Sequence, residues 1–135
     1  MTDPILHILT TTRRIAVVGA SNKAARPSNG VMAFLIARGF DVVGVNPGLA
    51  GQTLHGRPVV ATLEEAMPLD MVDVFRVSDQ VGPIMADAIR LGARTVWLQL
   101  GVGDAAAVAL GRAAGLQVVE NRCPKIEWQR LRLPT

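Results

Sequence analysis

A chain of 135 residues, half of them hydrophobic and 4% aromatic, is long enough to bury one core, and we expect a single domain over residues 1–135. Its apolar runs are far shorter than the roughly 20 residues of a membrane-spanning helix, which argues against a membrane protein. The net charge of +3 comes from dispersed basic residues without interleaved aromatic residues. This pattern argues against a nucleic-acid surface and favours an anionic small molecule as the ligand.

The N-terminal segment and the cysteine content indicate a cytoplasmic protein. Residues 1–14 (MTDPILHILTTTRR) place Asp3 and Pro4 before the apolar residues and lack a small-residue cleavage site, unlike a signal peptide. The single cysteine, Cys123, has no partner for an internal disulfide.

Five runs rich in aliphatic residues have the length of β-strands. They are nearly continuous in apolar residues, a pattern typical of strands in a parallel sheet that is covered on both faces. They occupy residues 15–19, 42–46, 71–75, 95–100 and 117–120. Residues 57–60 (RPVV) are a candidate for a short extra strand.

Helical patterns lie between these strands. The predicted helices occupy residues 28–38, 79–91, 104–114 and, as a short closing helix, 125–131. Ser28 or Asn29 is a suitable N-cap for the first of them, and Asp104 is one for the third. A capping-box pattern in residues 62–65 predicts a further helix, which Pro68 ends.

This alternation predicts an α/β fold, a doubly wound parallel sheet of about five strands with helices on both faces and right-handed crossovers. Ligands of such sheets bind beyond the carboxyl ends of the strands, near the point where the strand order reverses. We therefore expect a binding site among the segments that follow the strands. These segments are residues 19–28, 46–48, 75–78, 99–103 and 120–125.

The turn after the first strand has the composition of a phosphate site. Gly19 lets the backbone approach a ligand closely, and Ser21 adds a hydroxyl. Lys23 and Arg26 add cationic donors ahead of a helix N-terminus, which itself favours anions. Position 24 is alanine, so the phosphate loop of NTPases is absent. A turn that serves tight packing and holds no ligand remains an alternative.

The glycine pattern does not fit an NAD-binding turn. Position 21 is serine where the dinucleotide fingerprint requires glycine. The second strand ends in Asn46-Pro47-Gly48, without the carboxylate that holds the ribose hydroxyls of NAD. An NAD(P)-dependent oxidoreductase-type domain is therefore kept only as an alternative.

Five motifs, taken together, resemble the small stand-alone CoA-binding proteins. VVGASNKAARPSNGV, GFDVVGVNPGLAGQTLHGRPVVATLEE, VDVFRVS, VWLQLGV and VVENRCPKIEW follow one another over about residues 12–131. This family is similar to the CoA-binding domain of the succinyl-CoA synthetase α subunit and of NDP-forming acyl-CoA synthetases. The resemblance implies a Rossmann-like, non-catalytic domain that binds coenzyme A or acyl-CoA. It leaves open whether the protein forms a homodimer or supplies its CoA site to a synthetase-like partner chain.

The resemblance also implies a set of binding residues. Those expected around the CoA phosphates are Gly19, Ala20, Ser21, Lys23, Arg26, Pro27 and Ser28. Those expected along the rest of the cleft are Val45, Asn46 and Pro47 at the adenosine end, then Phe75, Arg76, Gln99, Gly101 and Cys123. CoA carries a diphosphate and a ribose 3′-phosphate, which suit lysine and arginine and would be repelled by an NAD-type carboxylate.

No catalytic residue and no metal site are predicted. His7 and His55 lie outside any catalytic or metal-ligand spacing and are interpreted as surface or packing side chains. Asp70 and Asp73, near the third strand, are interpreted as a turn residue and a residue at the edge of the pleat. Cys123 follows the last strand at the ligand edge. It is either a buried structural thiol or a thiol close enough to that of CoA for a mixed disulfide.

Overall fold

The computed structural model describes residues 3–134, so the two ends of the predicted domain lie outside the described residues. A seven-stranded sheet forms the centre of the molecule, in the order β3-β4-β2-β1-β5-β6-β7. The strands are β1 (Arg14–Val18), β2 (Asp41–Val45), β3 (Thr53–Leu54), β4 (Arg57–Val60), β5 (Met71–Val74), β6 (Thr95–Leu98) and β7 (Gln117–Val119). Neighbouring strands are parallel, apart from the antiparallel pair β3–β4 at one edge.

The predicted α/β class with a mainly parallel sheet is confirmed, but the sheet has seven strands where about five were expected. The additional strands, β3 and β4, come from residues 53–60. β4 is the candidate strand RPVV, and Pro58 precedes the part of β4 that pairs with β2, which begins at Val59. β3 has two residues, too few to show an alternating pattern in the sequence.

The helices lie close to their predicted positions. The structure contains α1 (Pro4–Thr11), α2 (Pro27–Ala37), α3 (Val81–Arg90), α4 (Ala105–Ala113) and α5 (Pro124–Arg130). Asp104 caps α4 as expected, because its side chain accepts a hydrogen bond from the amide of Ala107 at 3.0 Å. At the predicted capping box, the amide of Glu65 donates to the hydroxyl of Thr62 and that hydroxyl donates to the carboxylate of Glu65, but the pair starts only a 3-10 turn (Glu64–Ala66) instead of a helix. α1 was not predicted; Asp3 caps it through the amide of Ile5.

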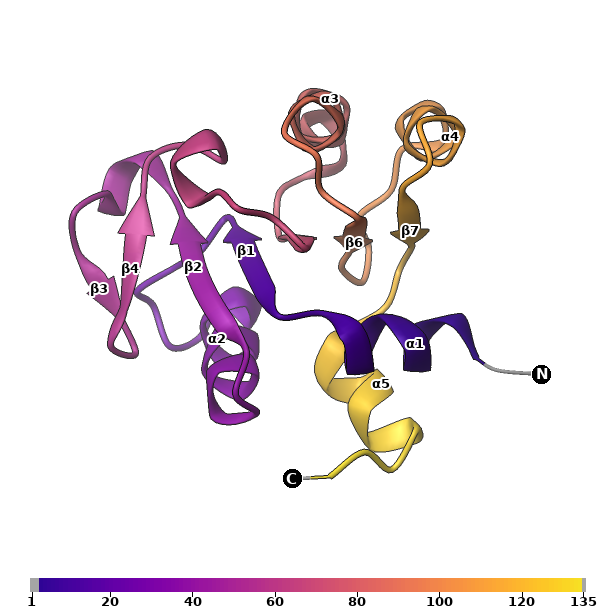
Figure 1. Cartoon of the computed structure of the whole chain (residues 1–135). Helices are drawn as coiled ribbons and strands as arrows, with labels where there is room; N and C mark the ends of the chain where they lie inside the picture. Colours follow the sequence, from indigo (N-terminus) through magenta and orange to yellow (C-terminus); the bar gives the residue numbers. More distant parts are fainter. Residues whose placement is uncertain (1–2, 135) are drawn as a thin grey trace.

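The helices cover both faces of the sheet, as Figure 1 shows: α3 and α4 lie on one face, and α1, α2 and α5 on the other. Each face has its own apolar cluster, since every strand presents alternate residues to opposite sides. Trp97, expected in the core, is fully buried, and its ring N–H donates to the carbonyl of Arg122 at 2.8 Å. Trp128 of α5 covers the same face, edge-on to Phe34 and Phe40. None of the helices in residues 3–134 is long and apolar enough to cross a membrane.

The strand order places the point of reversal beside β1. From β1 the chain moves through β2 to β4 on one side, and it returns to β5, β6 and β7 on the other. All six parallel strands therefore end at the same edge of the sheet, and the loops that follow β1, β2, β5, β6 and β7 meet there.

Asp73 corrects an expectation, because it lies in the core and not at the edge of the pleat. It is fully buried in β5, in register with Val17 on one side and Trp97 on the other. Neither carboxylate oxygen has a hydrogen-bond partner within residues 3–134. Burial raises the pKa of Asp73 well above its ordinary value of 3.8, because an apolar environment disfavours the charged form. Asp70 is a turn residue as expected, and it accepts the amides of Arg13 and Arg14.

We predict that Asp73 makes the fold less stable as the pH rises. Above pH 3.8 the carboxyl ionises in the unfolded chain but stays protonated in the folded one, so the free energy of unfolding falls until the raised pKa is passed. Asp73→Val should be more stable than the wild type at pH 7 by about 1–3 kcal/mol, and the gap should narrow toward pH 4. Urea unfolding of the wild type and the variant between pH 4 and 7 measures the stability difference and its change with pH. Asp73→Asn, which cannot ionise, is the control; a wild type that tracks this variant at every pH contradicts the prediction.

Candidate functional site

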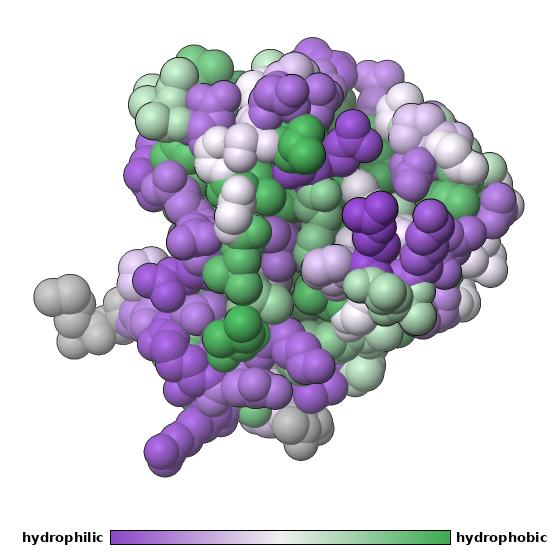
Figure 2. All heavy atoms as spheres, turned by 180° about the vertical axis from the view of Figure 1, so that it is seen from behind, coloured by the Kyte–Doolittle hydropathy of each residue, from purple (hydrophilic) through white to green (hydrophobic). Residues whose placement is uncertain are grey.

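A cavity of about 800 Å³ opens at the carboxyl edge of the sheet. Seen from behind in Figure 2, the surface is hollowed near its middle, with apolar side chains around the hollow and hydrophilic ones beyond them. The lining residues come from the loop after β1 and the start of α2, and from the segments that follow β2, β5, β6 and β7. The cavity therefore lies where the topology of the sheet predicts a ligand.

Gly19 directly follows β1 and contacts the ends of its two neighbours, β2 and β5. Its φ of +88° is a left-handed conformation that favours glycine, and its N–H donates to the carbonyl of Val45 at 3.0 Å. A Cβ at this position would lie 2.9 Å from the carbonyl oxygen of Phe75. The turn thus packs directly against the ends of β2 and β5, and only glycine fits without displacing one of them.

The loop between β1 and α2 is held by its own hydrogen bonds. The hydroxyl of Ser21 accepts the amide of Lys23 at 3.1 Å, and the side-chain amide of Asn29 donates to the carbonyl of Ser21 at 2.9 Å. α2 then begins at Pro27, with Arg26 at the N-cap in an extended conformation and without a side-chain cap, so the expected N-cap at Ser28 or Asn29 was wrong. The helix N-terminus thus remains available to an anion in the cavity.

Asn46 joins this loop to the end of β2. Its side-chain nitrogen donates to the carbonyl of Ala20 at 2.8 Å, and its side-chain oxygen accepts a hydrogen bond from the backbone amide of Gly48 at 2.9 Å. An NAD-type carboxylate at position 46 would lack the donor that meets Ala20. The asparagine therefore fixes the shape of the turn without adding negative charge.

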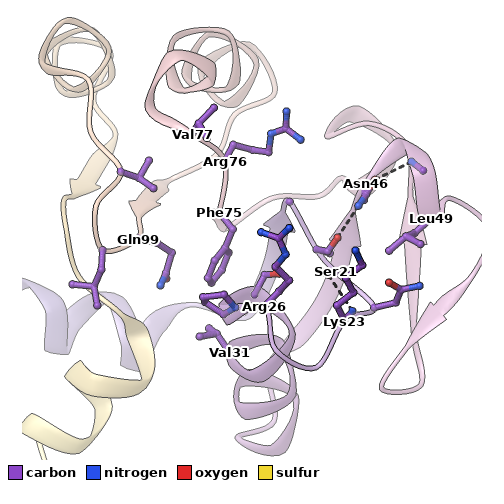
Figure 3. A pocket seen from close by; sticks show the side chains of 18 of the residues that line it. Ser21, Lys23, Arg26, Val31, Asn46, Leu49, Phe75, Arg76, Val77 and Gln99 are labelled. Atoms are coloured by element: carbon purple, nitrogen blue, oxygen red, sulfur yellow. Dashed lines mark hydrogen bonds between the residues drawn. The ribbon is translucent and has the colours of Figure 1, made fainter.

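The charge of the cavity is entirely positive. Lys23, Arg26 and Arg76 line it, and none of them forms an ion pair with any carboxylate in residues 3–134. No aspartate or glutamate is among the residues that line the cavity. In Figure 3, Lys23 and Arg26 come from the loop before α2, and Arg76 extends from the segment after β5. Such a set can bind phosphate by charge-assisted hydrogen bonds.

The opposite part of the cavity is mainly apolar. Phe75 lies at its centre beside Gln99, as Figure 3 shows. Val77 and Leu100 line it as well, although 65% and 56% of their surfaces are exposed. Gln99 is 6% exposed, and its side-chain oxygen has no hydrogen-bond partner in the described part of the chain. Cys123, just before α5, also lines the cavity, and the amide of the preceding Arg122 donates to the carbonyl of Leu98, next to Gln99.

Most of the residues expected at the site meet in this cavity. They are Gly19, Ala20, Ser21, Lys23, Arg26, Pro27, Ser28, Asn46, Phe75, Arg76, Gln99 and Cys123. Val45 and Pro47 line a smaller neighbouring pocket of about 320 Å³, which shares Gly19, Asn46 and Arg76 with the main cavity. Gly101 lines neither of them; its amide donates to the side chain of Asn121 at 2.8 Å.

Seven lining residues were not expected from the sequence. They are Asn22, Val31, Gly48, Leu49, Val77, Leu100 and Val102. Asn22, Gly48, Val77, Leu100 and Val102 fall within the segments expected at the ligand edge, so that prediction already pointed to them. Val31 had no separate signal, because an apolar residue in the first turns of a helix is typical of packing against the sheet.

The polar groups elsewhere do not form a second reactive site. Within residues 3–134, no three His, Cys, Asp or Glu side chains gather as metal ligands. His55 lies 3.2 Å from the side-chain oxygen of Asn29, outside the cavity, and His7 lies near the amino edge of the sheet. Both are consistent with surface histidines.

Comparisons with known proteins agree with this geometry. The family described as CoA binding domain matches residues 13–129 of the chain. The protein YneT of Bacillus subtilis is 30% identical over 90% of both chains. The structure of a hypothetical protein from Pyrococcus horikoshii OT3 superposes with a TM-score of 0.89, at 36% identity, over 98% of this chain and 93% of that one. RSP, a Rex-family repressor solved with β-NADH, is 15% identical with a TM-score of 0.58 over 90% of this chain and 61% of its own, which shows the fold alone.

We predict that Gly19→Ala destabilises the protein more than Gly51→Ala does. The two glycines have nearly the same φ, +88° and +87°, but a Cβ on Gly51 would meet no atom within 4 Å. Gly51→Ala should therefore cost only the left-handed strain of about 1–2 kcal/mol. Gly19→Ala should cost about 1–3 kcal/mol more, because it overpacks against Phe75. Urea unfolding of both variants measures the difference, and equal costs would disprove the close approach.

Proposed function

Because this chain belongs to the CoA binding domain family, we propose that its cavity holds coenzyme A or an acyl-CoA without transforming it. The observation that carries this proposal is the cluster of Lys23, Arg26 and Arg76 in a cavity without a carboxylate. Three neighbouring cations that form no ion pair within residues 3–134 favour an anionic ligand of comparable charge. The diphosphate and the 3′-phosphate of CoA supply that charge.

The turn after β1 is the proposed site of the phosphates. Backbone amides at the start of α2 point toward the ends of the strands, and the helix dipole adds a partial positive charge there. Arg26 lies at the N-cap of this helix and Lys23 three residues before it, so both cations reach the same region. Arg76 approaches from the segment after β5 and lines both the main cavity and the smaller pocket beside Val45 and Pro47. That pocket is the proposed place of the adenosine.

CoA is favoured over NAD(P) by the chemistry at the end of β2. NAD-binding domains use a carboxylate there to hold the ribose hydroxyls. Asn46 takes that position here, and its donor and acceptor are both used within the protein. The likeness to an NADH-binding repressor extends to the fold only, so it does not favour a nicotinamide cofactor for this chain.

The apolar part of the cavity is the proposed site of the pantetheine arm. Phe75, Val77 and Leu100 offer apolar surface, and Gln99 offers an amide for the amide groups of the arm. No histidine, aspartate or glutamate lines the main cavity, and Asp87 is the carboxylate that lines the smaller pocket, where it pairs with Arg90. The lining of the main cavity supports binding without catalysis. We propose that the chain acts as one CoA-binding domain, either alone, as a homodimer, or with a synthetase-like partner chain.

We predict that calorimetric titration ranks the ligands in the order CoA, then dephospho-CoA, with NAD and NADP last. Dephospho-CoA lacks the 3′-phosphate and should lose a charge-assisted contact, with an affinity about ten times weaker or more. Tighter binding of NAD or NADP than of CoA would contradict the proposal and favour an oxidoreductase-type domain. The absence of binding by any of the four would indicate a packing turn or a site that a partner chain completes.

We predict that Arg26→Ala weakens CoA binding by about 1.5–3 kcal/mol, the size of a hydrogen bond to a charged group. Arg13→Ala is the matched control: Arg13 is also exposed and has no ion pair in the described chain, but it lies at the opposite edge of the sheet. The control removes the same charge and should change the affinity little. An equal loss in both variants would mean that only net charge matters and that Arg26 makes no contact with phosphate.

A further inference from the structure

We propose that Cys123 is the attachment point of a reversible mixed disulfide with CoA, formed by exchange with CoA disulfide. The inference rests on the proposed function, because the pantetheine arm must first lie in the cavity. One end of the cavity then binds the phosphates of CoA, and the other end forms and breaks the disulfide between Cys123 and the CoA sulfur.

Cys123 lies at the apolar end of the cavity and has no competing partner. It is the only cysteine of the chain, so no internal disulfide can consume it. It is 9% exposed and lines the cavity, so a reagent reaches it by binding inside the cavity. A disulfide reagent that makes no contact with the cavity is not positioned to react there.

Gln99 supplies an independent sign that a ligand occupies this end. Its side chain is more than nine-tenths buried at the wall of the cavity, and its oxygen has no partner within residues 3–134. A buried amide oxygen without a hydrogen bond is costly, and such groups in native proteins usually have a partner. The last amide of pantetheine is only two carbons from the sulfur. An N–H from that amide would satisfy Gln99 and bring the sulfur to the same end of the cavity as Cys123.

The distance across the sheet agrees with the length of the arm. β1, β5, β6 and β7 are consecutive neighbours, so the loops that carry Gly19 and Cys123 are three strand spacings apart. At about 4.8 Å per spacing this separation is about 14 Å. The arm has twelve main-chain atoms beyond the phosphate ester oxygen, equivalent to about four residues, and at about 3.4 Å per residue it extends about 14 Å. Phosphate at the first turn therefore brings sulfur to Cys123.

The exchange balances without a further oxidant. Cys123 gives its proton to solvent, and its sulfur attacks one sulfur of CoA disulfide. The bond between the two CoA sulfurs breaks as the new bond forms, and the departing CoA thiolate takes up a proton. The disulfide oxidises the protein thiol and is itself reduced by the same two electrons. Any free thiol can reverse the step.

The test measures the rate of adduct formation on the reduced full-length protein by intact mass. CoA disulfide at about 10 μM should modify Cys123 about 100 times faster than the same concentration of hydroxyethyl disulfide, because binding raises its local concentration to the millimolar range. An excess of acetyl-CoA, which has neither a free thiol nor a disulfide, should abolish that advantage. Lys23→Ala combined with Arg26→Ala should reduce the rate at least tenfold. Cys123→Ala and Cys123→Ser should gain no mass.

The outcomes separate this inference from the proposed function. If calorimetry shows CoA binding but CoA disulfide reacts no faster than hydroxyethyl disulfide, the cysteine is structural and the inference is wrong. An adduct that persists in both cysteine variants, whose folding is checked by circular dichroism, also overturns it. If CoA does not bind to the reduced protein at all, the proposed function fails and this inference fails with it.

Discussion

The close approach of Gly19 to its neighbours is the contact on which the site depends. Its amide reaches the carbonyl of Val45 at the end of β2, and its Cα lies against the carbonyl of Phe75 at the end of β5. The absence of a side chain lets the chain turn between these two strands, at the point where the strand order reverses. The long loop after this turn carries Lys23 and Arg26. The direction in which the chain leaves the turn therefore sets the position of this loop.

The arginines at the amino edge of the sheet are mostly paired, unlike the cations of the cavity. Asp41 pairs with Arg14 and Arg57, and Asp70 pairs with Arg94, whereas Arg13 forms no ion pair in the described chain. At the carboxyl edge, the cations of the cavity have no such partners in the described chain, and no carboxylate lines the cavity. Exposed ion pairs contribute little to stability, so their uneven distribution matters more for binding than for folding. Three of the cations that form no ion pair within residues 3–134 therefore lie where a phosphate can use them.

Two buried polar side chains, one on β5 and one directly after β6, have oxygens without a hydrogen-bond partner within residues 3–134. Asp73 is buried in β5 between apolar neighbours, and Gln99 comes one residue after β6 at the wall of the cavity. Asp73 lies one layer below Phe75 on the same face of the sheet, because residues two apart in a strand share a face. Burial raises the pKa of Asp73, which does not line the cavity, whereas Gln99 lines the cavity and is available to a ligand.

The sequence by itself determined the parallel α/β class, four of the helices and the edge at which the site lies, because valine-rich strands, glycine stops and capping residues are local signals. It also pointed to the residues of the first turn, since a basic loop beside a glycine turn can be recognised without knowing the fold, and the family resemblance added Arg76. The sequence could not determine the depth of Asp73, the pairing of β3, or the place of Val31 in the wall of the cavity. These depend on which strands become neighbours, and residues far apart in the chain become neighbours only when the tertiary structure forms.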